Sequence, residues 1–143
     1  MNRILCILVV ATLSAVAVPA VYASVECHDA SLTGSWSVQA TGFANVGTSQ
    51  RFIPNVIVGS ITFDGDGSFT TTYTEAANGQ IFKDQHDTGT YVVHPDCTGS
   101  LESPGGGYHW QFVLTSDGSE AYAIETDSGT TNTAILKKQH SLD

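Results

Sequence analysis

The sequence predicts an all-β fold that closes into an eight-stranded antiparallel up-and-down β-barrel. Short segments that alternate apolar and polar residues are separated by Gly, Asp, Asn, Ser and Pro, and no stretch of a dozen residues shows a helical period. Most connections are short turns typical of hairpins, so consecutive strands are expected to pair antiparallel. Closing such a sheet on itself removes both exposed edges, which favours a barrel.

Each strand is predicted where alternation or β-branched and aromatic residues continue without a turn signal. Tight turns are expected where Gly or Asp residues cluster, as in 64–67 and 95–97. The longer connections 45–55, 77–87 and 104–107 are expected at the barrel ends, and 46–54 is either a lid or a solvated loop. The predicted strands cover residues 35–44, 56–63, 68–76, 88–94, 98–103, 108–115, 120–126 and 132–138.

Side-chain parity predicts which residues face the barrel interior, because alternate residues of a strand point to opposite faces. The clearest strand is 108–115, where Tyr108, Trp110, Phe112 and Leu114 share one face. The interior is therefore expected to be apolar and aromatic. Taken in strand order, the other inward residues are expected to be Trp36, Val38, Ala40, Ile61, Phe63, Phe69, Tyr73, Tyr91, Val93, Tyr122 and Ile124.

Residues 1–23 are predicted to be a secretory signal peptide, followed by a single β-barrel domain over 24–143. Arg3 precedes an apolar run, and small residues stand before the expected cleavage after Ala23. The alternative is an N-terminal membrane anchor. After cleavage no membrane span is expected, and the protein is predicted to be secreted or periplasmic.

Cys27 and Cys97 remain after the predicted cleavage, and we expect them to form a disulfide in an oxidising compartment. A redox pair or a metal site is disfavoured, because the sequence has no C-x-x-C and no histidine at ligand spacing. No metal or other cofactor is predicted. The formal net charge of −9, without a Lys/Arg cluster, argues against nucleic acid or an anionic membrane as partner.

Other catalytic and metal patterns are weak. There is no G-x-S-x-G elbow of a hydrolase. The acidic run from Asp64 to Glu75 has Phe69 where a calcium loop needs Gly, so a hairpin turn is favoured. The five histidines, which are expected at the surface, are His28, His86, His94, His109 and His140.

Glu75 is the best acid or base candidate in the sequence. It shares parity with Tyr73, so it points toward the cavity if the strand extends that far, and burial raises a carboxyl pKa. The alternative places Glu75 in solvent at the rim, where the strand has ended. The rim is favoured because carboxylates are rarely buried without a partner.

Two short motifs resemble those of calycin barrels. The segment Gly34-Ser35-Trp36 resembles the G-x-W that opens the first strand of lipocalins and avidins, and Ser31–Trp36 with Cys27 upstream is closer to the avidin form. The segment 59–73 also resembles the second and third avidin strands. The resemblance implies a calycin-like barrel in which the Trp closes one end and the early cysteine pairs with a much later one.

The resemblance to avidins does not extend to the biotin site. Val38, Gly42 and Ile135 stand near positions where avidins use Asn, Ser and Trp, and only Tyr73 is kept. These departures argue against biotin. The phrases in 89–101 and 134–139 also resemble small secreted barrels of the allene oxide cyclase kind, whose relatives close rings without a cofactor.

We therefore expect a small apolar or amphipathic ligand in the barrel mouth. The first alternative is a cofactor-independent cyclase or isomerase in which Glu75 or Tyr73 polarises the substrate. The second is a structural or interaction protein whose barrel is filled, since eight strands enclose either packed side chains or one small ligand. The sequence leaves the oligomeric state open. The predicted ligand-binding residues are Trp36, Tyr73, Tyr91, Trp110, Phe112 and Tyr122.

Overall fold

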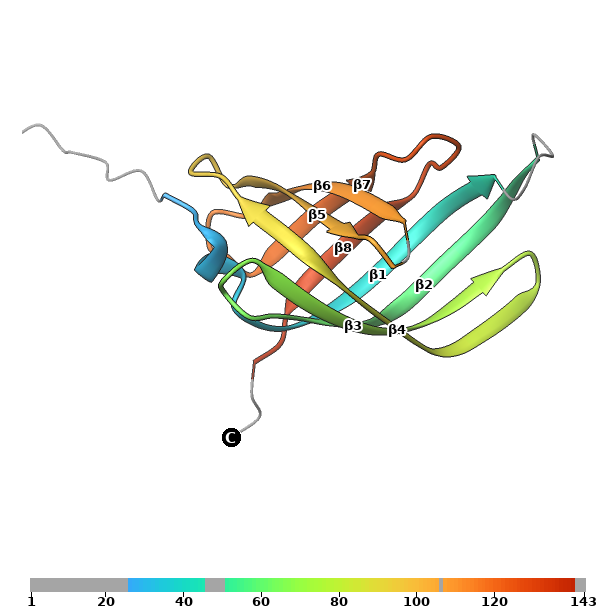
Figure 1. Ribbon diagram of the computed structural model, residues 1–143, viewed down its shortest axis with the longest axis horizontal. Helices are drawn as coiled ribbons and strands as arrows, with labels where there is room; N and C mark the ends of the chain where they lie inside the picture. The colour runs from blue at the N-terminus through green and yellow to red at the C-terminus, as the bar shows by residue number, and fades with distance from the viewer. Residues whose placement is uncertain (1–25, 46–50, 106, 141–143) are drawn as a thin grey trace, which may run out of the picture.

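The computed structural model describes residues 26–45, 51–105 and 107–140, and within these ranges the chain forms a closed barrel of eight antiparallel strands (Figure 1). Each strand pairs with the next, and β8 pairs with β1. The predicted all-β barrel is confirmed. A 3-10 helix precedes it, and no described segment is a helix long and apolar enough to cross a membrane. The elements are η1 (Asp29–Leu32), β1 (Gly34–Asn45), β2 (Phe52–Phe63), β3 (Ser68–Ala77), β4 (Gln80–Val93), β5 (Thr98–Ser103), β6 (Tyr108–Leu114), β7 (Glu120–Glu125) and β8 (Thr133–Lys138).

The long connection predicted over 77–87 is wrong, because β4 begins at Gln80. Asn78 and Gly79 form a two-residue turn with φ values of 49° and 79°, the conformation of a tight hairpin turn. Further along β4 the register shifts opposite the step from Tyr73 to Glu75, as it does at a β-bulge. The bulge breaks the alternation on which the prediction relied.

The predicted start of the second strand is also wrong, because β2 begins at Phe52 and includes Pro54. Pro54 pairs with Phe43 of β1, so the hairpin of β1 and β2 reaches beyond the predicted strands. Residues 46–50, which belong to the predicted lid, lie outside the described residues. Residues 1–25, which hold the predicted signal peptide 1–23, do so as well. In Figure 1 the β1–β2 and β3–β4 hairpins extend farthest at the end opposite η1.

The turn between β2 and β3 confirms the hairpin interpretation of the acidic run. Asp64 Oδ1 accepts hydrogen bonds from the backbone N–H groups of Asp66 and Ser68, at 2.8 and 2.9 Å. The carboxylate therefore caps its own turn.

One end of the barrel is closed by side chains that pack around Trp36. Its ring is fully buried, and its indole Nε1 donates a 2.6 Å hydrogen bond to the carbonyl of Leu32 in η1. The Trp36 ring meets Phe63 edge-on, with centroids 6.3 Å apart. The Tyr91 hydroxyl donates to the carbonyl of Asp29 at 3.1 Å. These contacts hold η1 across the end of the barrel.

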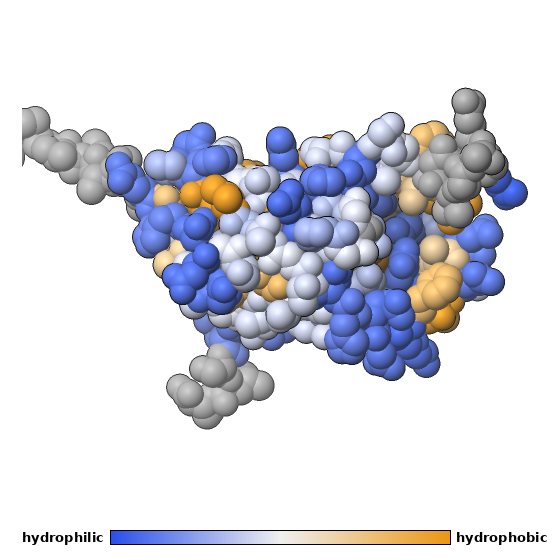
Figure 2. Space-filling model, in the orientation of Figure 1, coloured by the Kyte–Doolittle hydropathy of each residue, from blue (hydrophilic) through white to orange (hydrophobic). Residues whose placement is uncertain are grey.

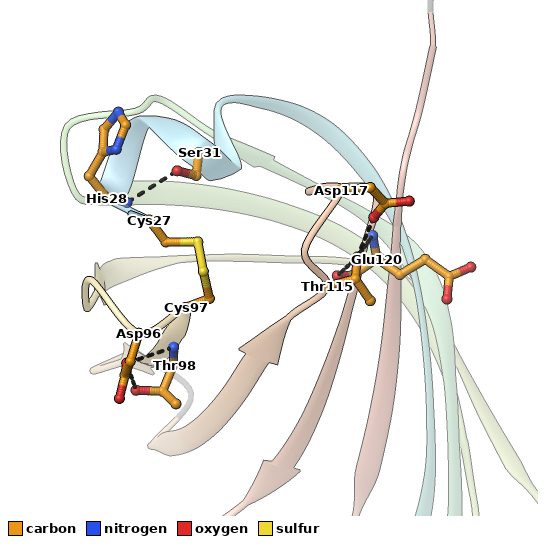
Figure 3. The surroundings of a disulfide bond; sticks show 9 residues. All are labelled: Cys27, His28, Ser31, Asp96, Cys97, Thr98, Thr115, Asp117 and Glu120. Carbon is orange, nitrogen blue, oxygen red and sulfur yellow. Dashed lines mark hydrogen bonds between the residues drawn. A yellow bond between two sulfur atoms is a disulfide. The ribbon is translucent and has the colours of Figure 1, made fainter. Parts of the chain in front are cut away.

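The predicted disulfide between Cys27 and Cys97 is confirmed, with Cα atoms 5.0 Å apart (Figure 3). It joins the segment before η1 to the turn between β4 and β5. Asp96 Oδ1 stabilises this turn by accepting from the backbone N–H and hydroxyl of Thr98, at 3.1 and 2.7 Å. The covalent bond and the Trp36 cluster therefore brace the same end of the molecule.

Three inward aromatic residues each lie across from a glycine on the neighbouring strand. A Cβ added to Gly59 would lie 2.7 Å from the Cβ of Tyr73, so only glycine leaves room for this side chain. The three pairs are Tyr73 with Gly59, Phe69 with Gly89, and Phe112 with Gly99. The aromatic side chains therefore occupy the space that side chains at the three glycine positions would otherwise take.

Candidate functional site

The barrel interior contains a half-open cavity of about 350 Å³ near the end opposite Trp36. Its inner part is lined by aliphatic side chains and Trp110, whereas polar residues gather toward the mouth. The residues that line it are Val38, Ala40, Ala44, Asn55, Ile57, Ile61, Phe69, Thr71, Tyr73, Glu75, Asp87, Leu101, Ser103, Gly107, Tyr108, Trp110, Ala123, Glu125, Asp127, Thr130, Asn132, Ala134 and Leu136.

The cavity exists because small residues meet on three adjacent strands. Ala134 of β8 pairs with Ala40 of β1 on one side and with Ala123 of β7 on the other. Directly opposite residues in antiparallel strands share a face, so this alanine row points inward. Bulky residues in these places would fill an eight-stranded barrel. The alanine row instead leaves space beside Trp110.

Above the alanine row, a polar row of Asn55, Asn132 and Glu125 faces the cavity. Gly42 of β1 pairs with Asn55 of β2 and contacts Asn132, which precedes β8. The backbone N–H of Glu125 donates to the carbonyl of Asn132 at 3.0 Å. The three polar side chains therefore come from neighbouring strands and lie around one arc of the wall, with Gly42 between the two asparagines.

The polar row is incompletely hydrogen-bonded. Asn132 Nδ2 donates a 2.5 Å hydrogen bond to Glu125 Oε2. The Oδ1 atoms of Asn55 and Asn132 are buried and find no partner among the described residues. A buried acceptor without a partner costs about 1–3 kcal/mol, and native proteins keep few of them. Both acceptors lie in one arc of the cavity wall, where a bound group can reach them.

Glu125 is the buried carboxyl of this cavity, with 7% of its surface exposed. Burial raises the pKa of Glu125, the neighbouring charges of Asp127 and Glu75 raise it further, and the hydrogen bonds from Asn132 and Thr130 only partly oppose them. A buried carboxyl with a raised pKa is a candidate general acid or base.

Tyr73 and Tyr108 face each other across the mouth, and the Tyr108 hydroxyl donates to that of Tyr73. Burial raises the pKa of both phenols, and the nearby carboxylates Glu75 and Asp87 raise them further. Both groups are therefore neutral near pH 7 and offer hydrogen bonds without charge.

Asp127 lies at the outer edge of the mouth and pairs with His109. Its carboxylate accepts hydrogen bonds from the backbone N–H and from Nδ1 of His109, both at 2.7 Å. Burial tends to raise the pKa of Asp127, but the hydrogen bonds from His109 outweigh it and lower the pKa. The same hydrogen bond is the main cause of the raised pKa of His109. His109 is exposed, as predicted for all five histidines, which the structure places at the surface.

The structure brings Tyr73, Glu75 and Trp110 of the predicted site together in the cavity wall. β3 continues to Ala77, so the strand has not ended at Glu75, which lines the cavity near its mouth and is partly exposed. Trp36 and Tyr91 are buried in the closed end, and Phe112 packs against Gly99, so none of the three lines the cavity. Trp36, Tyr91 and Phe112 are therefore part of the hydrophobic core near the closed end.

The predicted inward direction of Tyr122 and Ile124 is wrong. Tyr122 is 47% exposed, and the inner face of β7 carries Ala123 and Glu125 instead. The reason is the register, in which Phe112 of β6 pairs with Ala123. Because the Phe112 ring already occupies the interior there, only a small residue fits opposite. On the outer face Tyr122 hydrogen-bonds Glu120 at 2.8 Å, so it has no place in the predicted ligand site.

The wrong parity on β7 concealed Glu125, the most buried carboxyl of the cavity. A strict alternation from the buried Ala121 would have identified it, but small residues give a weak inward signal. Asn55 and Asn132 were missed because one fell in a predicted connection and the other at the first residue of a predicted strand. Among the described residues no three His, Cys, Asp or Glu side chains are grouped to hold a metal ion.

No protein-family model and no curated protein matches this chain. Among solved structures it is similar to a redesigned β-barrel, mFAP0, bound to DFHBI, with 18% sequence identity and a TM-score of 0.45. The match covers 76% of this chain and 99% of the other. The barrel assignment for this chain rests on its own strand pairing.

Proposed function

We propose that this protein is an exported β-barrel of calycin type that binds one small amphipathic molecule in its cavity. The observation that carries the proposal is a cavity of about 350 Å³ with an apolar inner wall and a polar mouth. Pockets for small ligands have this size and this division, in which apolar walls give affinity and a few polar groups give orientation. The cavity argues against the alternative of a filled barrel.

Two further features support export and the calycin type. The disulfide between Cys27 and Cys97 suits an oxidising compartment. Trp36 closes one barrel end, as the resemblance to lipocalins and avidins implies. Amino-terminal sequencing of the mature protein tests the export signal, with Ser24 as the expected first residue.

The binding proposal is tested by native mass spectrometry of the protein purified from its own host. We expect a retained small molecule in the wild-type protein and its loss in Ala134→Leu, which fills the alanine row. Thr133→Leu is the matched control, because this substitution introduces the same leucine side chain on the exposed outer face of β8. An empty wild-type protein whose thermal stability no small amphipathic compound changes would overturn the proposal.

A second candidate function is a cofactor-independent cyclase or isomerase that uses the same cavity. The buried carboxyl of Glu125 with its raised pKa favours this candidate, and Tyr73 and Glu75 stand on the facing wall. The retained molecule is incubated with the protein and analysed by chiral chromatography. Conversion by the wild type that Glu125→Gln abolishes while binding persists supports an enzyme, whereas unchanged molecule in all samples supports a binding protein alone.

A further inference from the structure

Two unpartnered acceptors point to the chemistry of the molecule that the cavity takes. Asn55 is 8% exposed and Asn132 is 5% exposed, both side chains line the cavity, and the Oδ1 atom of each has no hydrogen-bond partner among the described residues. An amide oxygen accepts hydrogen bonds and cannot donate them. A molecule that completes these two groups must therefore bring donors.

Glu125 adds a carboxyl group between the unpartnered acceptors and the apolar inner wall. Asn132 Nδ2 donates to Glu125 Oε2, but each carboxylate oxygen has more than one acceptor site. The pairing of β6 with β7 sets Trp110 directly opposite Glu125 on the inner face. A cation held by Glu125 would therefore lie next to an indole ring, whose face also attracts cations.

The charges around the mouth have one sign. Glu75, Asp87 and Asp127 line the cavity with Glu125, and no Lys or Arg is among the described residues that line it. His109 pairs with Asp127 and is exposed, and among the described residues the other three carboxylates form no ion pair with a Lys, Arg or His side chain. Carboxylates gathered around one mouth favour a positive ligand and oppose a negative one.

We infer that the ligand is a protonated primary amine on an apolar body of about the size of a bicyclic aromatic group, an inference that rests on the proposed binding function. The ammonium group provides three donors, which suit the polar row of Asn55, Asn132 and Glu125. The apolar body packs on the alanine row and Trp110. A cation that completes these acceptors forms charge-assisted hydrogen bonds, which are stronger than neutral ones.

The inference is tested by isothermal titration calorimetry of the full mature protein with three matched probes: naphthylethylamine, naphthylethanol and the carboxylate anion of naphthylacetic acid. These share an apolar body and differ in the charge of the head group. We expect the amine to bind at least roughly tenfold more tightly than the alcohol, and the carboxylate to bind least. Glu125→Gln is expected to reduce amine binding by roughly tenfold and to leave the alcohol unchanged.

Glu102→Gln is the matched control. Glu102 is an exposed carboxylate on the outer face of β5, and its replacement by Gln changes the net charge as Glu125→Gln does. It is expected to alter neither affinity. If the alcohol or the carboxylate binds as tightly as the amine, the inferred cation is wrong while binding in the cavity stands. If none of the three binds and native mass spectrometry finds no retained molecule, the binding function fails together with this inference.

Discussion

Asn132 packs directly against Gly42, so closely that a Cβ on Gly42 would lie 2.6 Å from the Asn132 Cα and nearer still to its Oδ1. The missing side chain at position 42 is what allows Asn132 to turn into the barrel and bond Glu125. A glycine on β1 therefore determines the geometry of a site that belongs to β7 and β8.

The first prediction concerns this contact. Gly42→Ala is expected to lower the free energy of unfolding by about 1–3 kcal/mol, the usual cost of overpacking, and to weaken amine binding by displacing Asn132. Urea unfolding and titration with naphthylethylamine measure the two effects. Gly105→Ala is the control, because its added Cβ meets only the side chain of Asp87, at 3.3 Å. If Gly42→Ala were as stable as Gly105→Ala and bound the amine equally well, the close contact between Gly42 and Asn132 would be contradicted.

The second prediction separates the two tryptophans. Trp36→Phe is expected to cost about 2–3 kcal/mol, because it leaves the Leu32 carbonyl without its donor and opens a gap in the closed end. Trp110→Phe is expected to cost less than about 1 kcal/mol, since Trp110 borders empty space, yet to weaken ligand binding. Chemical denaturation of both variants measures the difference. The reverse order of stability would show that the closed end lies elsewhere.

The third prediction concerns the disulfide. Replacing both Cys27 and Cys97 by Ser is expected to lower the free energy of unfolding by about 4 kcal/mol, because the bond joins residues 70 positions apart and restricts the unfolded chain. Affinity for naphthylethylamine is expected to stay unchanged where the variant remains folded, because the disulfide lies at the end opposite the cavity. Denaturation and titration are carried out on the same preparation. Loss of binding in a folded variant would contradict this separation.

The fourth prediction is a pH dependence from the pair of Asp127 and His109. The lowered pKa of Asp127 contributes stability above its unfolded value of about 3.8, and this is lost as the pH falls through the folded pKa. The raised pKa of His109 contributes stability below its unfolded value of 6.5, and this is lost as the pH rises through the folded pKa.

The pair is therefore expected to stabilise the fold most between about pH 4 and 6.5. Because the His109 side chain is largely exposed, solvent screens the pair and the effect is small. His109→Gln is expected to remove the decline in stability above pH 6.5 relative to wild type. Thermal unfolding across the pH range measures it, and an NMR titration of His109 with no upward shift in pKa would refute the pairing.

The fifth prediction is that Glu125→Gln stabilises the empty protein at pH 7. Burial raises the pKa of Glu125, so the folded state binds more protons than the unfolded state, and stability falls as the pH rises from about 4.5 through the folded pKa. Gln keeps the acceptor for Asn132 but carries no charge. Thermal unfolding at pH 4 and pH 7 is expected to show the gain at pH 7 alone. If Glu125→Gln were less stable than the wild type at both pH values, the prediction would be wrong, because the protein would already compensate the charge of Glu125.

The apolar surface at the mouth end belongs to the extended hairpins. Figure 2 shows apolar atoms at the end where β3 and β4 meet. Phe52, Ile81 and Phe82 are exposed in these hairpins. They lie in the segments that the sequence predicted as connections, where Pro54 and the bulge in β4 interrupt the alternation.

The sequence by itself determined the barrel and the disulfide, whereas the closed end around Trp36 was expected only from the resemblance to lipocalins and avidins. The barrel and the disulfide depend on local or countable properties: the two-residue alternation of strands, the Gly and Asp of hairpin turns, and two cysteines after the predicted signal. The alternation is set by the pleat of a single strand, so it can be recognised without knowing the neighbours.

Only the tertiary structure decided which face of β7 points inward and where the interior stays empty. Both depend on strand register: Phe112 opposite Ala123 turns Tyr122 outward, and Ala40, Ala134 and Ala123 meet on three strands to leave the cavity. Asn55, Asn132 and Glu125 form one arc for the same reason, although Asn55 is distant in sequence. Register is a property of strand pairs, and side chains compete for volume only once the barrel has closed.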